Sequence, residues 1–135
     1  MKITTWNVNS INARLEHLIR FIKQDQSDIY LIQELKCTNE KFPKNEIKNL
    51  KYKSYVNGQK AWNGVALFCK NELNITNNKI PDYKDENARL IEAEIELKNI
   101  KKKIKLINIY LPNGNPIETE KFDYKIEWMN KFNNY

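Results

Sequence analysis

The sequence predicts a mixed α/β domain in which strands outnumber helices, and two patterns carry this prediction. Near the N-terminus, a strand, an amphipathic helix and a second strand follow one another within residues 2–34, which is the size of a parallel crossover unit. Further along, residues 89–97 alternate apolar and acidic side chains, and the apolar run 104–112 follows a lysine-rich turn. Such a pair is typical of an antiparallel hairpin. The length of 135 residues fits one domain with a sizeable core.

The first crossover unit is assigned from its hydrophobic periodicity. The first strand is expected over residues 2–8. Its alternate residues share one face: Ile3, Thr5 and Asn7. Ser10 or Asn12 is expected to cap the helix that follows. That helix carries one apolar stripe, made by Ile11, Leu15, Leu18, Ile19 and Ile22. The segment "DQSD" ends the helix, and residues 28–34 are expected to form the next strand.

The remaining elements follow from the same signals. A short helical stretch is expected to begin near Pro43, and strands are expected at about 52–57 and 64–70, joined by the loop "GQKAWNG". A loop rich in proline, glycine and asparagine, 112–116, precedes a final amphipathic helix that is expected to start near Glu118.

The composition is that of an ordinary globular protein with a basic surface. The net charge is +6 and the isoelectric point about 9.2, which favours polyanionic partners. Asparagine, lysine and isoleucine dominate the composition, however, so this charge is weak evidence for DNA binding. The run "KNIKKKIK" at 98–105 is therefore interpreted as a solvated hairpin rather than a DNA contact.

Cysteine content and hydropathy exclude several classes of protein. Cys37 and Cys69 are expected to be reduced thiols, one of them packed in a strand, because the sequence has neither a CxxC motif nor clustered histidines. No apolar stretch approaches the ~20 residues of a membrane helix, and the N-terminus does not resemble a signal peptide. We therefore expect a cytoplasmic protein with no membrane partner.

Two predicted strands end in polar side chains that suit a metal ion. Asn7 closes the first strand and Glu34 closes the second. Because parallel strands joined by a right-handed crossover end at the same edge of a sheet, these side chains should meet where ligands usually bind. Carboxylate and amide oxygens suit Mg²⁺ or Mn²⁺. Two alternatives stay open: Glu34 is merely solvated, or Asn7 satisfies backbone groups in a turn.

A series of motifs gives the sequence a family resemblance over nearly its whole length. The motifs are "WNVNSINAR" (6–14), "LIQELKCTNEKFP" (31–43), "NGVALF" (63–68), "ARLIEAEI" (88–95), "INIYLPNG" (107–114) and "KFDYKIEWMNKF" (121–132). In order and spacing they resemble the N-terminal half of exodeoxyribonuclease III-type AP endonucleases, of the endonuclease/exonuclease/phosphatase superfamily.

The resemblance implies a fold and an activity. The fold would be the N-terminal half of a DNase I-like four-layer α/β sandwich, with a mixed sheet flanked by helices. The activity would be Mg²⁺-dependent cleavage of duplex DNA 5′ to an abasic site, with 3′-exonuclease or 3′-phosphatase activity as well; Mn²⁺ could replace Mg²⁺. The implied partner is double-stranded DNA with abasic or 3′-blocked sites, and the complete enzyme is expected to be a monomer.

The resemblance also implies roles for individual residues. Asn7 and Glu34 match the family's metal site, with Glu34 and Tyr110 as catalytic residues. At the end of its strand, the Tyr110 phenol can donate a hydrogen bond to a phosphate oxygen as negative charge builds up. Without the motif, Tyr110 would be interpreted as a core tyrosine at a strand end.

Two further residues are implied to lie near the substrate phosphate. Asn113 falls in the family's active-site loop, although an asparagine before a glycine is also an ordinary turn residue. Arg89 falls where the family carries an arginine near DNA, although it could instead pair with Glu92 or Glu94.

Several motifs that the family's mechanism needs are missing. An Asp-x-Asn motif, a further aspartate and a Ser-Asp-His motif lie in the family's C-terminal half, and no counterpart occurs here. The single histidine, His17, is interpreted as a surface residue, and "PDYKDEN" (81–87) matches none of these motifs. Residues 1–135 are therefore expected to be a partial domain whose C-terminal half is absent, inactive alone and with uncovered sheet edges. Two alternatives stay open: a catalytically dead remnant that binds nucleic acid, or a small-molecule phosphoesterase of the same fold.

Overall fold

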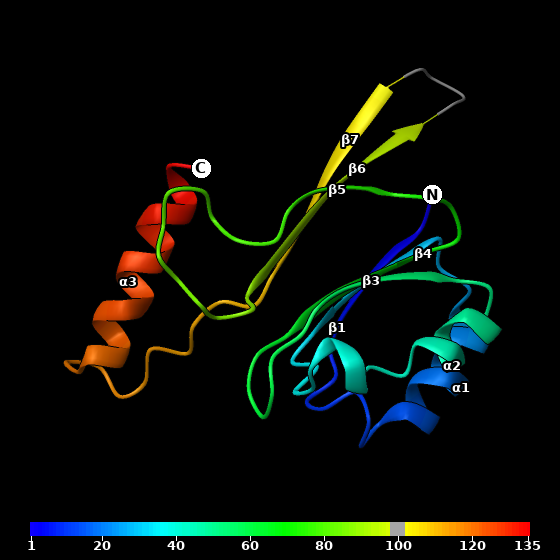
Figure 1. Ribbon diagram of the computed structural model, residues 1–135, viewed down its shortest axis with the longest axis horizontal. Helices are drawn as coiled ribbons and strands as arrows, with labels where there is room; N and C mark the ends of the chain where they lie inside the picture. Colours follow the sequence, from blue (N-terminus) through cyan, green and yellow to red (C-terminus); the bar gives the residue numbers. More distant parts are fainter. Residues whose placement is uncertain (98–101) are drawn as a thin grey trace.

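Two β-sheets stack face to face with helices on both outer faces, so the chain builds four layers (Figure 1). This computed structural model describes residues 1–97 and 102–135. Helices α1 (Leu15–Asp25) and α2 (Lys44–Asn49) pack on the four-stranded sheet, and α3 (Glu120–Asn133) packs on the three-stranded sheet. The predicted α/β class, with a mixed sheet flanked by helices, is confirmed.

The four-stranded sheet contains the predicted crossover unit. Strands β1 (Ile3–Asn7) and β2 (Ile29–Gln33) run parallel and end at the same edge. Strand β4 (Val65–Cys69) lies antiparallel to β2, and β3 (Lys53–Asn57) lies antiparallel to β4. The strand order is therefore β1-β2-β4-β3.

The three-stranded sheet is built around the predicted hairpin. Strands β6 (Leu90–Leu97) and β7 (Lys102–Ile109) pair antiparallel, as expected. Strand β5 (Asn74–Asn77) adds an edge next to β6 and was not predicted. Its sequence, NITN, is short and mostly exposed, so it carries no alternating apolar signal. Of the predicted solvated hairpin at 98–105, residues 98–101 lie outside the described residues.

The start of α1 differs from the prediction. The helix begins at Leu15, and neither Ser10 nor Asn12 caps it. Ser10 Oγ instead accepts a 3.4 Å hydrogen bond from the Ala13 N–H in the preceding turn. Asn12 Nδ2 donates to the Lys41 carbonyl at 3.2 Å. The capping prediction is wrong because the Ser10 side chain bonds within the loop before α1 and the Asn12 side chain bonds to the segment around Lys41.

The other two helical segments lie close to their expected positions. Helix α2 follows Pro43 directly, as predicted, and a short 3₁₀ turn, η1 (Asn39–Lys41), precedes it. Helix α3 begins at Glu120, two residues later than expected, because Glu118 has a left-handed backbone conformation with φ 60°.

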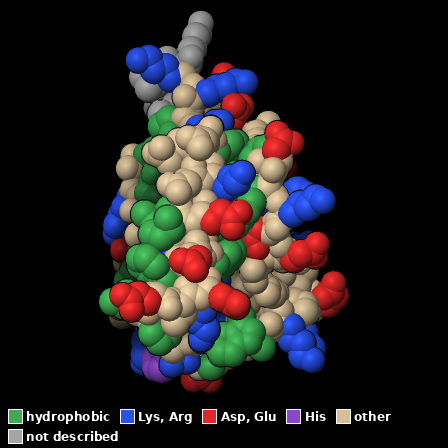
Figure 2. Space-filling view, turned by 90° about the vertical axis from the view of Figure 1, so that its left-hand side faces the viewer, with side chains coloured by type: hydrophobic (Ala, Val, Ile, Leu, Met, Phe, Trp, Pro, Cys, Tyr) green, Lys and Arg blue, Asp and Glu red, His purple; other side chains and the backbone are tan. Residues whose placement is uncertain are grey.

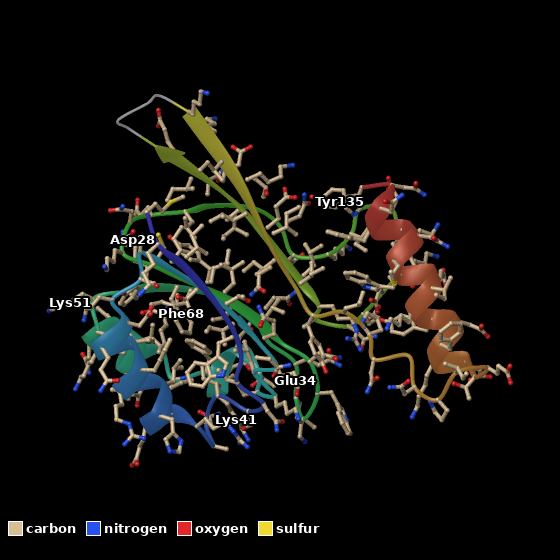
Figure 3. All side chains as sticks on the ribbon, turned by 180° about the vertical axis from the view of Figure 1, so that it is seen from behind. Asp28, Glu34, Lys41, Lys51, Phe68 and Tyr135 are labelled. Atoms are coloured by element: carbon tan, nitrogen blue, oxygen red, sulfur yellow. The ribbon has the colours of Figure 1, made fainter. Side chains whose placement is uncertain are left out.

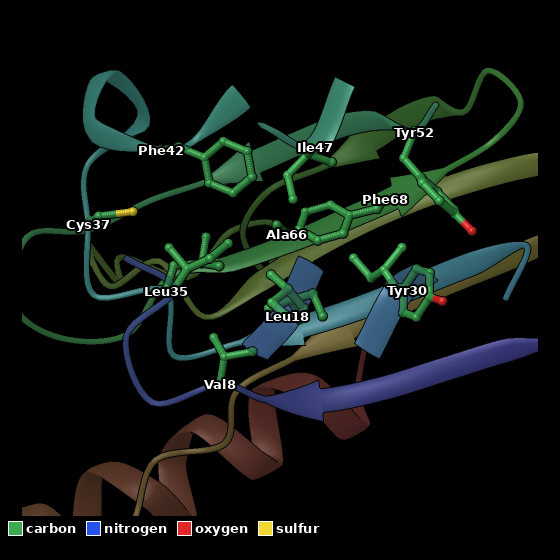
Figure 4. Close-up of a cluster of buried hydrophobic side chains, with 13 residues drawn as sticks. Val8, Leu18, Tyr30, Leu35, Cys37, Phe42, Ile47, Tyr52, Ala66 and Phe68 are labelled. Carbon is green, nitrogen blue, oxygen red and sulfur yellow. The ribbon is translucent and has the colours of Figure 1, made fainter. Parts of the chain in front are cut away.

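The core has two main layers. One lies between the helices and the four-stranded sheet (Figure 4) and includes Leu18, Ile22, Ile47, Tyr30, Ile32 and Phe68. The other lies between the sheets and includes Ile29, Val65, Leu67, Ile91, Ala93 and Leu106. A smaller cluster under α3 is centred on Trp128, which is 1% exposed. Cys37 and Cys69 are buried free thiols, as predicted, and Cys69 lies in β4.

One acidic residue of β6 departs from the expected polar face. Glu92 is only 1% exposed. The Tyr135 hydroxyl donates to Glu92 Oε2 at 2.5 Å, and Lys105 Nζ lies 3.4 Å from Oε1. Tyr135, two residues beyond the end of α3, thus helps to cover a carboxylate that the alternating pattern placed towards solvent.

Strands β1 and β7 lie at the ends of the strand order. Ile3 points to the same side of its sheet as its buried partner Ile29, yet it is 42% exposed.

Viewed from the side of α3, basic, acidic and hydrophobic side chains are interspersed, so this face carries no continuous positively charged patch (Figure 2). Within residues 1–97 and 102–135, no helix has the length and apolar character needed to cross a membrane.

Candidate active site

The carboxyl ends of β1 and β2 bring the two predicted metal-site residues together. Asn7 Nδ2 donates to Glu34 Oε1 at 2.7 Å. Asn7 Oδ1 in turn accepts a hydrogen bond of 3.1 Å from the Asn9 N–H, so Asn7 also serves the turn that follows β1. Glu34 comes directly after β2 and has φ 55°. Figure 3 shows Glu34 at one edge of the sheet and Asp28, from the other end of β2, at the opposite edge.

The Glu34 carboxylate has two more polar neighbours. Lys36 Nζ lies 3.1 Å from Glu34 Oε2, and the Tyr110 hydroxyl hydrogen-bonds to the same carboxylate. Burial raises the pKa of Glu34, but hydrogen bonds from Asn7, Tyr110 and Lys36 outweigh it and hold that pKa below its usual value. Glu34 is therefore ionised at neutral pH and offers negatively charged oxygens at the edge of the sheet.

Tyr110 follows β7 and reaches Glu34 from the other sheet. Burial and the neighbouring Glu34 carboxylate raise the pKa of the Tyr110 phenol, with Arg89 opposing them. The phenol is therefore neutral at pH 7 and remains a hydrogen-bond donor.

Arg89 contacts both the backbone and the aromatic ring of Tyr110 and so holds Tyr110 in place. Its Nη1 donates to the Tyr110 carbonyl at 3.1 Å, and its guanidinium carbon lies 5.2 Å from the centre of the Tyr110 ring. Its Nε donates to the Tyr124 hydroxyl at 3.1 Å. The alternative in which Arg89 pairs with Glu92 or Glu94 is wrong, because those carboxylates pair with lysines of β7.

Asn113 lies apart from this cluster. Its Oδ1 accepts from Asn115 Nδ2 at 2.7 Å, and its carbonyl accepts from Lys125 Nζ at 3.3 Å. Its side chain is exposed and bonds within its own loop, as the turn alternative expected. A role for Asn113 at a phosphate stays a prediction.

Sequence reasoning missed the polar network behind Arg89. Asn87 Nδ2 donates to Asp85 Oδ1 at 2.8 Å and to the Tyr124 hydroxyl at 3.2 Å, and that hydroxyl donates to Asp85 Oδ2 at 2.7 Å. Asn63 Nδ2 reaches Asn87 Oδ1 at 3.1 Å. These residues come from two loops and a helix, so no local spacing in the sequence predicts that they meet.

A second missed residue joins the two sheets beneath the site. Asn108 is 1% exposed, and its Nδ2 donates to the carbonyls of Ile32 and Ala66, each at 2.9 Å. Its Oδ1 accepts from Gln33 Nε2 at 2.6 Å. One signal was available: an asparagine inside the apolar strand that ends at Tyr110.

The residues at this edge fit a hard divalent cation. Glu34 is ionised, its side chain is 17% exposed, and its hydrogen-bonded neighbour Asn7 carries an amide group. Among residues 1–97 and 102–135, no group of three or more His, Cys, Asp or Glu side chains gathers as a metal site. One carboxylate suits Mg²⁺, which fills its other positions with water and phosphate, better than zinc. Glu34 would hold the ion. Asn7 could join only by turning its amide over, since Oδ1 now faces Asn9.

The fold of stacked sheets is shared with solved structures of DNA-processing enzymes. An AP endonuclease from Archaeoglobus fulgidus superposes with a TM-score of 0.90 at 34% identity, covering 100% of this chain and 50% of that one. The 3′ phosphatase NExo from Neisseria, bound to a product DNA hairpin, gives a TM-score of 0.92 at 32% identity, with 100% and 51% covered. The fold is thus that of half an AP endonuclease domain.

The family follows from the sequence match. Residues 4–127 match the model of the Endonuclease/Exonuclease/phosphatase family, and the chain belongs to this family. Exodeoxyribonuclease III of Haemophilus influenzae is 35% identical over 115 residues, which cover 84% of this chain and 42% of the relative. DNA repair nuclease APEX1 of Danio rerio is 29% identical over 142 residues, covering 100% of this chain and 43% of the relative. The chain spans less than half the length of these two relatives, and the predicted resemblance to the N-terminal half is confirmed.

Proposed function

We propose that this chain is the metal-binding half of an exodeoxyribonuclease III-type phosphodiesterase that hydrolyses duplex DNA 5′ to abasic sites. The observation that carries the proposal is the meeting of Asn7, Glu34 and Tyr110 at one edge, from three strands of two sheets. The names of the similar proteins agree with this activity: an AP endonuclease, an exodeoxyribonuclease III and a DNA repair nuclease.

The chain's own residues divide the work at the phosphate. Glu34 holds the divalent ion, which when bound supplies charge neutralisation at the phosphoryl oxygens. The Tyr110 phenol, neutral and positioned by Arg89, donates a hydrogen bond to a phosphoryl oxygen as charge develops. Asn7 orients the Glu34 carboxylate. Alignment and deprotonation of the attacking water need further groups, which by the family resemblance belong to the C-terminal half of the domain.

A second candidate is a nucleic-acid-binding remnant without catalysis. It is favoured by the chemistry of the described site, which has one carboxylate and no histidine. His17, the single histidine of the chain, lies exposed on α1, as predicted. No described side chain near Glu34 is suited to accept the proton of a water at neutral pH.

Metal binding and strand incision together separate the two candidates. The chain is titrated with Mn²⁺ by electron paramagnetic resonance. For incision, the chain is joined to a C-terminal half that supplies the water-activating groups, and is incubated with Mg²⁺ and a labelled duplex that carries a tetrahydrofuran abasic-site analogue. Mn²⁺ binding that Glu34→Gln abolishes, together with incision 5′ to the analogue that EDTA stops, supports the phosphodiesterase. DNA binding without incision favours the remnant. His17→Gln is the matched control, since it changes an exposed side chain on α1 and should behave as wild type.

A further inference from the structure

The loop between β3 and β4 exposes a tryptophan that the proposed function does not use. Trp62 is 69% exposed, the largest exposed fraction among the large hydrophobic side chains of the described residues. The other two tryptophans are covered: Trp128 is 1% exposed and Trp6 is partly buried against the core. The exposed indole of Trp62 leaves a large flat apolar ring face open to a ligand.

The loop that carries Trp62 is held in a fixed conformation. The Gln59 side-chain oxygen accepts hydrogen bonds of 2.9 Å from the Ala88 N–H and from Asn63 Nδ2. Ala61 and Asn63, on either side of Trp62, have positive φ angles of 66° and 54°. Such conformations cost energy in residues other than glycine and persist where the surroundings enforce them, often at binding sites. The loop therefore presents the indole in a set direction.

The same loop is fastened to the candidate active site. The Asn63 carbonyl accepts from the Lys36 N–H at 3.0 Å, and the Gly64 carbonyl accepts from the Leu35 N–H at 3.1 Å. Gly64 has φ 86°, and a Cβ there would lie 2.9 Å from the Leu35 Cβ, so only glycine permits this close approach. Trp62 thus sits one residue from a segment bonded to the backbone just after Glu34. Figure 1 shows this loop projecting from the end of the four-stranded sheet.

We propose that Trp62 stacks on a nucleobase of the DNA whose phosphate is held at Glu34. This inference rests on the proposed function and adds a contact to it. The indole offers a flat π surface, which binds any base without reading its sequence, and the exposed Lys60 two residues away supplies a positive charge for the backbone. An abasic site leaves unstacked base faces, and a rigid aromatic ring beside the phosphate site is suited to cover one of them.

Intrinsic fluorescence tests the contact directly, because Trp62 is the one strongly exposed tryptophan. The chain is titrated with a short duplex that carries a tetrahydrofuran abasic-site analogue, with Ca²⁺ in place of Mg²⁺. Stacking should quench the wild-type emission, and Trp62→Phe should remove the quenching while binding remains within a few-fold. Trp62→Ala should weaken binding by about 5- to 150-fold, since stacking is worth ~1–3 kcal/mol per base. Met129→Ala is the matched control: it removes an exposed apolar side chain, 43% exposed on α3, and should bind as wild type.

The outcomes separate this inference from the proposed function. If wild-type chain binds the duplex and Trp62→Ala binds it equally well, or saturation leaves the emission unchanged, Trp62 does not contact a base and the inference fails alone. That result would point to a protein surface as the partner of the loop. If wild-type chain binds no duplex at all, the inference and the DNA-directed function fail together. The thermal unfolding midpoint of Trp62→Ala is measured as well. A midpoint equal to that of wild type means that any loss of binding does not come from a loss of fold.

Discussion

Asn7 Nδ2 lies 2.7 Å from Glu34 Oε1, and this one hydrogen bond joins residues 27 positions apart in the chain. It ties together the ends of two parallel strands and fixes the orientation of the only carboxylate in the cluster with Lys36 and Tyr110. Whatever this edge of the sheet binds will meet a carboxylate whose position is set before the ligand arrives. Preorganisation of this kind reduces the cost of ordering the site on binding.

Glu34→Gln should weaken divalent-cation binding without unfolding the chain. The amide keeps the shape of the side chain but removes the charge that holds a hard cation, so Mn²⁺ affinity should fall by at least roughly 10-fold. Isothermal titration calorimetry measures this affinity, and circular dichroism checks the fold. Glu72→Gln, an exposed carboxylate that pairs with Lys53 elsewhere, is the control. Unchanged Mn²⁺ affinity in Glu34→Gln would show that the metal is held by other groups.

Lys36→Met should have the opposite effect and strengthen divalent-cation binding. The Lys36 ammonium lies 3.1 Å from Glu34 Oε2 and repels a second cation at the same carboxylate. Removing about 1 kcal/mol of repulsion predicts a gain in Mn²⁺ affinity of roughly fivefold, smaller at high salt. Lys53→Met, which loses its ion pair with Glu72 far from the site, should leave the affinity unchanged. A loss of affinity in Lys36→Met would mean that Lys36 organises the site rather than competing for it.

Tyr110→Phe should reduce strand incision while leaving metal binding intact. In the proposed function the phenol donates to a phosphoryl oxygen in the transition state, and removal of one such donor typically lowers kcat by about 100-fold. Single-turnover incision of an abasic-site duplex measures the loss, with this chain joined to a C-terminal half that supplies the water-activating groups. Tyr55→Phe is the control, because its hydroxyl accepts a hydrogen bond from the Leu73 N–H away from the site. A loss of DNA affinity with unchanged single-turnover rate would assign Tyr110 to binding instead.

The convergence of Asn7 and Glu34 was predictable because the handedness and length of a crossover unit fix where its strands end. Apolar periodicity likewise located β2, β6 and β7, since each buries at least part of one face, and β1, whose Thr4 and Trp6 are half-buried on one face. Strand β5 was not predicted because its residues are held by pairing with β6 rather than by burial. Periodicity reports burial, so an exposed edge strand leaves no trace in the sequence.

The partners of Arg89 were not predictable for a different reason. Nearby carboxylates on the same strand made an ion pair the obvious expectation, but Tyr124 arrives from 35 residues further on. A guanidinium between two aromatic rings is stabilised by their π faces, and this depends on how α3 docks on the sheet. Docking of a helix is a tertiary property, and no spacing in the strand encodes it.

Stability should fall in acid partly through Asp25, which lies at the opposite end of the sheet from Glu34. Hydrogen bonds from Lys2 and Ser27 lower the pKa of this carboxyl well below its ordinary value. A carboxyl whose pKa is depressed by folding contributes stability that is full above its unfolded pKa and is lost as the pH falls through its folded pKa. The unfolding free energy of wild type should therefore exceed that of Asp25→Asn at pH 7, and the difference should shrink below about pH 4. Urea unfolding of both proteins from pH 7 to pH 3 measures this difference. Asp82→Asn, in an exposed loop, is the control. A difference that grows in acid would contradict the stabilising role of the Asp25 carboxylate.

Asn108 should be a main determinant of how the two sheets hold together. Asn108→Ala removes three hydrogen bonds between β7 and the four-stranded sheet, two of them buried, so the free energy of unfolding should fall by about 2–3 kcal/mol. Asn108→Asp keeps the shape but turns a carboxylate oxygen towards the Ile32 and Ala66 carbonyls, and should cost more than alanine at pH 7. Asn74→Ala, in exposed β5, should change stability by less than about 0.5 kcal/mol. Urea unfolding ranks the three variants. An Asn108→Asp protein as stable as wild type would mean that the inter-sheet hydrogen bonds contribute little and that apolar burial alone sets the spacing of the sheets.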